Sequence, residues 1–334
     1  VVGATPALAR VAAGTAVLAA VLLATATVPA YAVVGGQSAG PGGLDRIAGL
    51  LWPLLIAAAA ASVLVGWLPR FGLAFLGVTG ALGPGLVLQR LYAWQPVSDH
   101  RAVEVVAGRR LVTSTFEPGT GAVLDLAGAA VLVLTLVLTM LAWPRTPMDD
   151  DGGFDGRRQV TLGVSAFAGL LGVLAVSARG IAAPALVTQD AIGFRTSVEV
   201  AADVAVLERF GFDRAGGLLL ALGVILAALI AAGLRPRLAV VGALAGLSAW
   251  AGPAALVLVL QAARFDDVVP GLGAWLLLLC GLVFGGLAGW ARAAAPRAAG
   301  ELGSDLPGGG LPRDTSMAGL PPDRGTAQGG AGDD

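Results

Sequence analysis

Lysine and asparagine do not occur in this chain of 334 residues, and charged residues make up only 13% of it. Hydrophobic residues make up 56%. A water-soluble domain cannot bury that much apolar surface, so the expected solvent is a lipid bilayer. All 21 cationic residues are arginine, a usage that indicates a GC-rich bacterial gene. We therefore expect a multi-pass protein of the bacterial cytoplasmic membrane, with the lipid bilayer as its partner.

The chain has one cysteine, Cys280, and one histidine, His100. These counts exclude a disulfide within the chain and the CxxC and HExxH motifs. A Walker A loop needs the absent lysine, and no GxSxG nucleophile motif occurs. The net charge of −1 provides no basic field for nucleic acid. We therefore predict no enzyme activity, no metal, no cofactor and no nucleic-acid partner.

Long apolar runs are what the sequence does contain. About 20 helical residues cross the hydrocarbon core of a bilayer, which is roughly 30 Å thick. The runs lack the two-residue alternation of transmembrane β-barrel strands. They cover residues 11–34, 47–67, 71–90, 122–143, 160–182, 215–234, 238–261 and 271–291. The predicted fold is an all-α polytopic membrane protein with eight transmembrane helices within residues 1–291.

The first run has two interpretations. Arg10, the apolar stretch and the small residues up to Ala32 resemble a secretory signal peptide and its cleavage site. The apolar stretch is longer than the roughly 7–15 residues of a typical signal core, which favours a retained first helix.

Tryptophan and arginine positions indicate the helix boundaries and their orientation. Tryptophan favours the membrane interface, and among the seven only Trp250 lies inside a run rather than near its end. Short turns at 67–71 and 234–238 carry arginine without an acidic residue. By the positive-inside rule both termini are cytoplasmic, and the loops 93–121 and 184–214 lie outside.

Both of these loops carry signals of local structure. In the first, residues 102–116 alternate as two short strands around a turn. In the second, the sequence "TSVE" at 196–199 matches a helix capping box and precedes apolar residues at helical spacing. We expect a hairpin in the first loop and a short surface helix in the second.

One phrase occurs twice in the chain. The sequence "ALGPGLVLQ" (81–89) is similar to "WAGPAALVLVLQ" (250–261). This repetition predicts two parallel four-helix units, 11–143 and 160–291, in which the third and seventh helices correspond. The alternative is that Gly and Pro are simply common in membrane helices.

The repeated phrase also gives the candidate transport or hinge site. Matching helix breaks in two halves are typical of transporter binding sites, although proline kinks are also routine in membrane bundles. The candidate residues are Gly83, Pro84, Gln89, Gly252, Pro253 and Gln261.

Ionisable side chains within the runs are few. Arg90, Asp125 and Arg179 are the candidates for charges that gate a vestibule, with Asp125 paired either to Arg90 or, across the two units, to Arg179. The alternative is that Asp125 and Arg179 extend to the interface and contact water.

Glycines at a spacing of four indicate helix packing. Such spacing places them on one face, where another backbone can approach closely. The residues concerned are Gly242 and Gly246 in the seventh run, and Gly281, Gly285 and Gly289 in the eighth. Their packing partner is either another helix of the chain or another subunit.

Residues 292–334 are rich in Gly, Pro and Asp and nearly free of large apolar groups. Such a segment cannot offset its ordering entropy by burial, so we expect a disordered cytoplasmic tail.

Two functions are compatible with this sequence. The first is a non-enzymatic subunit or scaffold of a cell-envelope assembly, with other membrane or envelope proteins as partners. The second is a permease for an apolar or uncharged solute. The scarcity of buried charge favours the scaffold, because ion-coupled transporters normally need a buried carboxylate. A polar cavity that reaches the Gly–Pro pairs would favour the permease.

Overall fold

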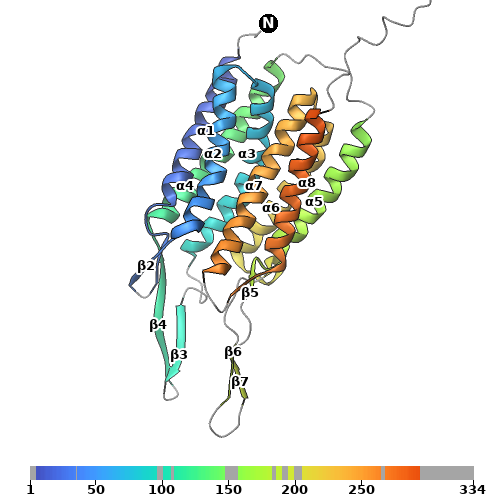
Figure 1. Ribbon diagram of the computed structural model, residues 1–334. Coiled ribbons are helices and arrows are strands. Elements are labelled where there is room, and N and C mark those ends of the chain that lie inside the picture. Colours follow the sequence, from blue (N-terminus) through green and yellow to red (C-terminus); the bar gives the residue numbers. More distant parts are fainter. Residues whose placement is uncertain are drawn as a thin grey trace, which may run out of the picture. The chain divides into compact units, whose positions relative to one another are not determined.

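The computed structural model describes residues 5–34, 36–95, 101–106, 109–146, 157–182, 186–189, 195–198, 205–264 and 268–293. Eight α-helices dominate this part of the chain (Figure 1). They are α1 (Ala7–Ala26), α2 (Gly43–Val65), α3 (Pro69–Leu91), α4 (Thr120–Ala142), α5 (Arg158–Ser177), α6 (Gly211–Gly233), α7 (Arg237–Ala263) and α8 (Leu272–Ala293). Each is long and apolar enough to cross a membrane, so the eight predicted spans are confirmed.

The helix ends differ from the predicted runs. α1 ends at Ala26 rather than at residue 34, because the chain continues as strand β1 (Ala32–Val34). α2 begins at Gly43 and carries the charged Asp45 in its first turn. α6 likewise begins at Gly211, before the predicted start at residue 215. A search for uncharged runs misses such turns, since membrane helices continue beyond the hydrocarbon core. The predicted tail lies outside the described residues from 294 onwards.

In α1, small residues face inwards and large apolar residues face outwards. In α1, Ala12, Ala16 and Ala19 are fully buried, whereas Val11 and Leu18 are each 51% exposed. This arrangement is the reverse of a soluble protein core, where the largest apolar groups are inside. It suits a lipid environment, because small residues let helix backbones approach while lipid covers the large side chains.

In the described parts of the connections, eight strands and three 3₁₀ turns link the helices. A four-stranded sheet has the order β2-β1-β4-β3, and β5–β8 and β6–β7 form two-stranded antiparallel pairs. These strands lie at the end of the bundle opposite the first residues of α1, which we call the hairpin end (Figure 1). The bounds are β2 (Gln37–Ala39), β3 (Arg101–Val106), β4 (Arg109–Pro118), β5 (Ile181–Ala182), β6 (Leu186–Gln189), β7 (Arg195–Val198), β8 (Val269–Pro270), η1 (Tyr92–Trp94), η3 (Trp143–Arg145) and η5 (Val206–Glu208).

The two long loops contain strands. Residues 102–116, expected to form two strands, lie in the antiparallel hairpin of β3 and β4. The helix expected from the capping box at Thr196 is wrong where the structure describes it, because Arg195–Val198 is the strand β7. Its residues pair with β6, which precedes it in the chain. A capping box is a local pattern, so it contains no information about such pairing. Glu199 lies outside the described residues.

The helices contact one another in two corresponding groups, α1–α4 and α5–α8. α1 packs on α4, and α5 packs on α8. α3 and α7 contact each other, and each also contacts the second helix of the other group: α3 meets α6, and α7 meets α2. Residues from both groups therefore meet along α3 and α7.

The connections into α4 and α8 are also built alike. In both, a Pro–Gly pair precedes the helix, and the proline ends a strand that pairs with the segment following α1 or α5. The backbone hydrogen bonds correspond, from Gly119 to Tyr31, Gly121 to Ala30, Gly271 to Gly180 and Gly273 to Arg179, with N···O distances of 2.8–2.9 Å.

The contact between α3 and α7 depends on glycine. A methyl group on Gly242 of α7 would overlap the carbonyl oxygen of Phe71 in α3, and one on Gly246 would lie 3.0 Å from the carbonyl oxygen of Phe75. By contrast, a methyl group on Gly289 of α8 would meet no described atom within 4 Å. The two helices are thus in backbone contact at the end opposite the hairpins.

Gly242→Ala should destabilise the protein by about 1–3 kcal/mol, because the overlapping atom is backbone and cannot rotate away. The matched variant Gly289→Ala should leave stability unchanged or slightly raise it, since alanine favours helix and has open space there. Thermal unfolding of both variants in the same mild detergent measures the difference. Equal melting temperatures would contradict a close α3–α7 contact.

Candidate functional site

A cavity of about 1000 Å³ lies within the hairpin-end half of the bundle. Its volume is in the range of small-molecule sites. Each of the eight described helices contributes to its wall, as do the connections around Tyr31, Gly180 and Arg209. The cavity is therefore formed jointly by the two helix groups.

Most of the cavity wall is apolar. Leu86 of α3, Leu220 of α6 and Leu277 of α8 line it, together with the indoles of Trp52 and Trp250. The indole Nε1 of Trp52 is buried and has no hydrogen-bond partner among the described residues. A buried donor without a partner is costly and uncommon.

The charged pair Arg90–Asp125 lies in this wall. Nε of Arg90, on α3, donates to Oδ2 of Asp125, on α4, at 2.5 Å. The side chains are only 15% and 19% exposed. Nη1 of Arg90 is buried and has no hydrogen-bond partner within the described part of the chain. The pair is thus shielded from solvent but incompletely satisfied.

Tyr31 stands beside this pair, in the connection after α1. Burial raises the pKa of its phenol, the negative charge of Asp125 raises that pKa further, and Arg90 opposes the change. Tyr31 is therefore neutral near pH 7 and keeps its O–H as a hydrogen-bond donor.

Two further ion pairs lie toward the cavity mouth. Asp45, in the first turn of α2, is 5% exposed and lies 3.6 Å from Nη1 of Arg264, just after α7. Its carboxylate also accepts from the backbone N–H of Gly42 at 3.3 Å. Because Arg264 follows α7 and Asp45 starts α2, the pair connects the two helix groups.

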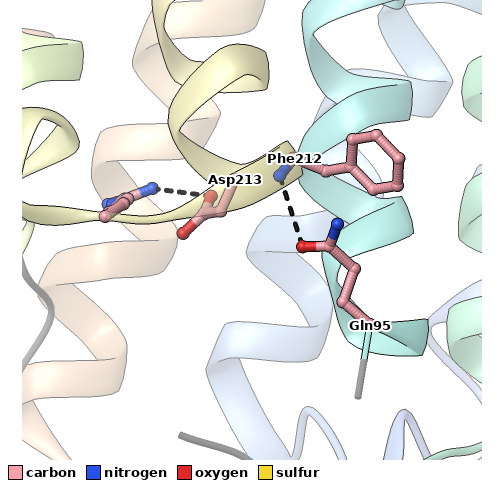
Figure 2. Close-up of polar contacts among 4 residues, drawn as sticks. Gln95, Phe212 and Asp213 are labelled. Atoms are coloured by element: carbon pink, nitrogen blue, oxygen red, sulfur yellow. Dashed lines mark hydrogen bonds and ion pairs between the residues drawn. The ribbon is translucent and has the colours of Figure 1, made fainter. Parts of the chain in front are cut away.

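The second of these pairs is at the start of α6. Nη1 of Arg209 donates to Asp213 at 3.2 Å, and the backbone N–H of Phe212 donates to Oε1 of Gln95 at 3.3 Å (Figure 2). Gly211 has a φ of +58°, and a Cβ there would lie 2.5 Å from Oε1 of Gln95. Glycine is thus required where the segment after α3 meets α6.

The six candidate transport residues divide into two sets. Gln89, Pro253 and Gln261 line the cavity. Gly83 instead packs against Val133 of α4, and Pro84 lines a separate apolar cavity of about 490 Å³ between α3, α4 and α6. Gly252 packs against Gly281. Both α3 and α7 continue as helix through their Gly–Pro pairs.

The three candidate gate charges also divide. Arg90 and Asp125 pair with each other in the cavity wall. Arg179 instead pairs with Glu208 at 3.2 Å, and these side chains are 55% and 53% exposed. The alternative pairing of Asp125 with Arg179 is wrong, because Asp125 pairs with Arg90 and Arg179 pairs with Glu208.

Two of the three candidate packing glycines of α8 lie against another helix of the chain. Gly281 lies against Gly252 of α7, and Gly285 lies against Ser248, whose hydroxyl donates to the carbonyl oxygen of Gly281 at 2.8 Å. Gly289 has open space beside it, as noted above.

Several cavity residues have no clear signal in the sequence. Trp52 falls near the end of a predicted run, and only the longer α2 places it inside the helix. Asp45, Arg209 and Arg264 flank the runs and resemble ordinary interfacial charges. Trp250 did carry a signal, since it is the one tryptophan inside a predicted run.

Fold and cavity together define a multi-pass helical membrane protein, by the length and composition of its spans, with an internal cavity of ligand size. No protein-family model, curated protein or solved structure compared with the chain matches it. Within the described residues no group of three or more His, Cys, Asp or Glu side chains is placed to hold a metal ion.

Asp125→Asn should destabilise the protein by about 1–3 kcal/mol, because it leaves the shielded guanidinium of Arg90 without a counter-charge. The matched variant Glu208→Gln removes the carboxylate of the exposed Arg179 pair and should cost less than about 1 kcal/mol. Chemical or thermal unfolding in one detergent compares the two. A similar loss in both variants would show that the Arg90 pair is not buried.

Proposed function

We propose that this protein is a permease that binds a small solute with a largely apolar body in the cavity between its two helix groups. The observation that carries this proposal is the cavity itself, to which every described helix contributes. A cavity at the junction of two helix groups is where transporters of repeated architecture bind substrate. A scaffold has no need of such a space.

The proposal includes an internal duplication, with α1–α4 and α5–α8 as parallel units. The corresponding helix contacts and the corresponding Pro–Gly connections support it. A relative motion of the two units would change the cavity's access. In this structure Gly242 of α7 lies against the backbone of Phe71 in α3, at the end opposite the hairpins.

We also propose that the protein lies in a bacterial cytoplasmic membrane with both termini inside and the hairpin end outside. The short turns between α2 and α3 and between α6 and α7 carry Arg70, Arg235 and Arg237 without an acidic residue. They lie at the end opposite the hairpins, which the positive-inside rule assigns to the cytoplasm.

The second candidate function is a scaffold within an envelope assembly. The open space beside Gly289 supports it, because a helix of another protein could approach α8 closely there. Stable partners that co-purify in mild detergent would favour this function.

Labelling of single cysteines tests the permease. Ala254 lines the cavity, and Ala243 lies about three turns away on the same face of α7, where it is fully buried. In a Cys280→Ala background, Ala254→Cys should react with a membrane-impermeant maleimide from the hairpin side only. Ala243→Cys should react slowly from the opposite side, because the other access state opens that path.

Both variants replace an alanine of α7 by cysteine, so their labelling rates can be compared directly. Labelling of neither cysteine in the folded protein, with full labelling after denaturation, would contradict an accessible cavity. If only Ala254→Cys is labelled, the cavity opens to one side of the membrane only. The protein then binds a ligand without transporting it.

A further inference from the structure

The arginine and aromatic donors of the cavity outnumber its carboxylates, and the amides of Gln89 and Gln261 each add a donor and an acceptor. Three arginines, two tryptophans and Tyr31 line it, whereas Asp45 and Asp125 are its lining carboxylates. Each arginine already has a carboxylate partner, Arg209 through Asp213 outside the lining. The charges of the wall are therefore close to balanced, but two of its hydrogen-bond donors have no acceptor among the described residues.

Two of these donors lack a partner in the described structure. They are Nη1 of Arg90 and Nε1 of Trp52, on α3 and α2. Both nitrogens are buried in this structure, so a ligand meets them only when their side chains turn toward the cavity. Because a buried donor without a partner is costly, a molecule that supplies an oxygen acceptor to one of these donors gains a favourable hydrogen bond.

The acceptor has to suit a guanidinium. Hydrogen bonds from arginine to anionic oxygen are about twice as strong as those between neutral groups. The low dielectric of the bundle interior strengthens such a bond further. An anionic oxygen group is therefore the best match to Arg90, although Asp125 limits the site to a head group of low charge.

The remaining wall accommodates an apolar body. Leu23, Leu86, Val257 and Leu277 line the cavity on four different helices. A purely ionic solute would leave this surface without a contact.

The second helix group lacks this charged pair. The matching Pro–Gly connections place Leu277 of α8 at the position that Asp125 occupies in α4, six residues after Gly271 and Gly119. Both residues line the cavity. At this pair of positions the wall is therefore charged on one side of the cavity and apolar on the other.

We infer that the cavity binds an amphiphile with a singly charged anionic oxygen head group, which Arg90 holds while the apolar tail lies against the leucine wall. This inference rests on the proposed function and specifies its substrate class: the permease would carry a molecule of the fatty-acid type rather than an uncharged solute.

Three probes separate the head group from the tail: decanoate has both, decanol has the tail, and acetate has the head group. Each is added to the Ala254→Cys, Cys280→Ala protein in nanodiscs of neutral lipid, and the rate of maleimide labelling is measured. Decanoate should slow labelling about tenfold, the effect of one charge-assisted hydrogen bond. Decanol and acetate should each slow it less than about twofold.

The variant that tests the recognition neutralises the pair as Arg90→Gln with Asp125→Asn, so that no buried charge is left alone. In it, decanoate should protect no better than decanol. The matched control, Arg179→Gln with Glu208→Gln, neutralises the exposed pair and should keep the protection by decanoate. Circular dichroism and elution volume establish that both double variants are folded.

The results that would contradict anion recognition differ from the results that would contradict the permease. Equal protection by decanoate and decanol, or protection that survives neutralisation of the Arg90 pair, would show an apolar site without anion recognition. Protection by acetate alone would show an ion site and overturn the amphiphile. No protection by any probe would also overturn the inference, while the two-sided labelling of Ala243→Cys and Ala254→Cys decides the permease separately.

Discussion

Close contact between helix backbones is the constraint on which this structure depends. In lipid, helices gain little from hiding apolar side chains, so they associate where small residues allow the backbones to meet. Alanine provides such a surface along α1, and Gly242 and Gly246 provide it where α7 meets α3. Large apolar side chains such as Val11 and Leu18 of α1 are left exposed on the outside of the bundle. The order of the helices follows from which of them offer small residues to one another.

The cavity lies where the helices are not in close backbone contact. At the end opposite the hairpins, α3 and α7 are in backbone contact. Toward the hairpin end the same two helices carry Gln89, Arg90, Trp250 and Gln261 in the cavity wall. Larger and more polar side chains thus take the place of glycine, and the helices enclose space instead of excluding it. A charged pair is tolerable there because Arg90 and Asp125 neutralise each other's charge, which lowers the free-energy cost of placing either charge among apolar helices.

The hairpin end also holds the two helix groups together. Arg264, after α7, pairs with Asp45 at the start of α2, and Gln95, after α3, accepts a hydrogen bond at the start of α6. Both contacts cross between the groups, and both lie near the mouth of the cavity. Motion of one group against the other would have to change them. They are weak enough to do so, because one is a partly exposed ion pair and the other a single hydrogen bond.

Local sequence determined the eight spans, because a run of about 20 apolar residues has few alternatives to a membrane helix. It also singled out Arg90, Asp125, Gln89 and Gln261, which line the cavity, and Arg179, which does not. It misassigned the capping box at Thr196, where pairing with β6 prevails over a local helix signal.

Only the tertiary structure decided which candidates meet. Pro84 and Pro253 have a similar sequence context, yet they line different cavities. Arg90 and Arg179 both lie near the end of a predicted run and both pair with an acidic residue. Only the Arg90 pair is largely shielded from solvent. Span length and composition are properties of one segment, whereas the direction of a side chain and its partners depend on how several helices pack. For that reason the sequence alone established a membrane bundle, and the packing established where it can hold a ligand.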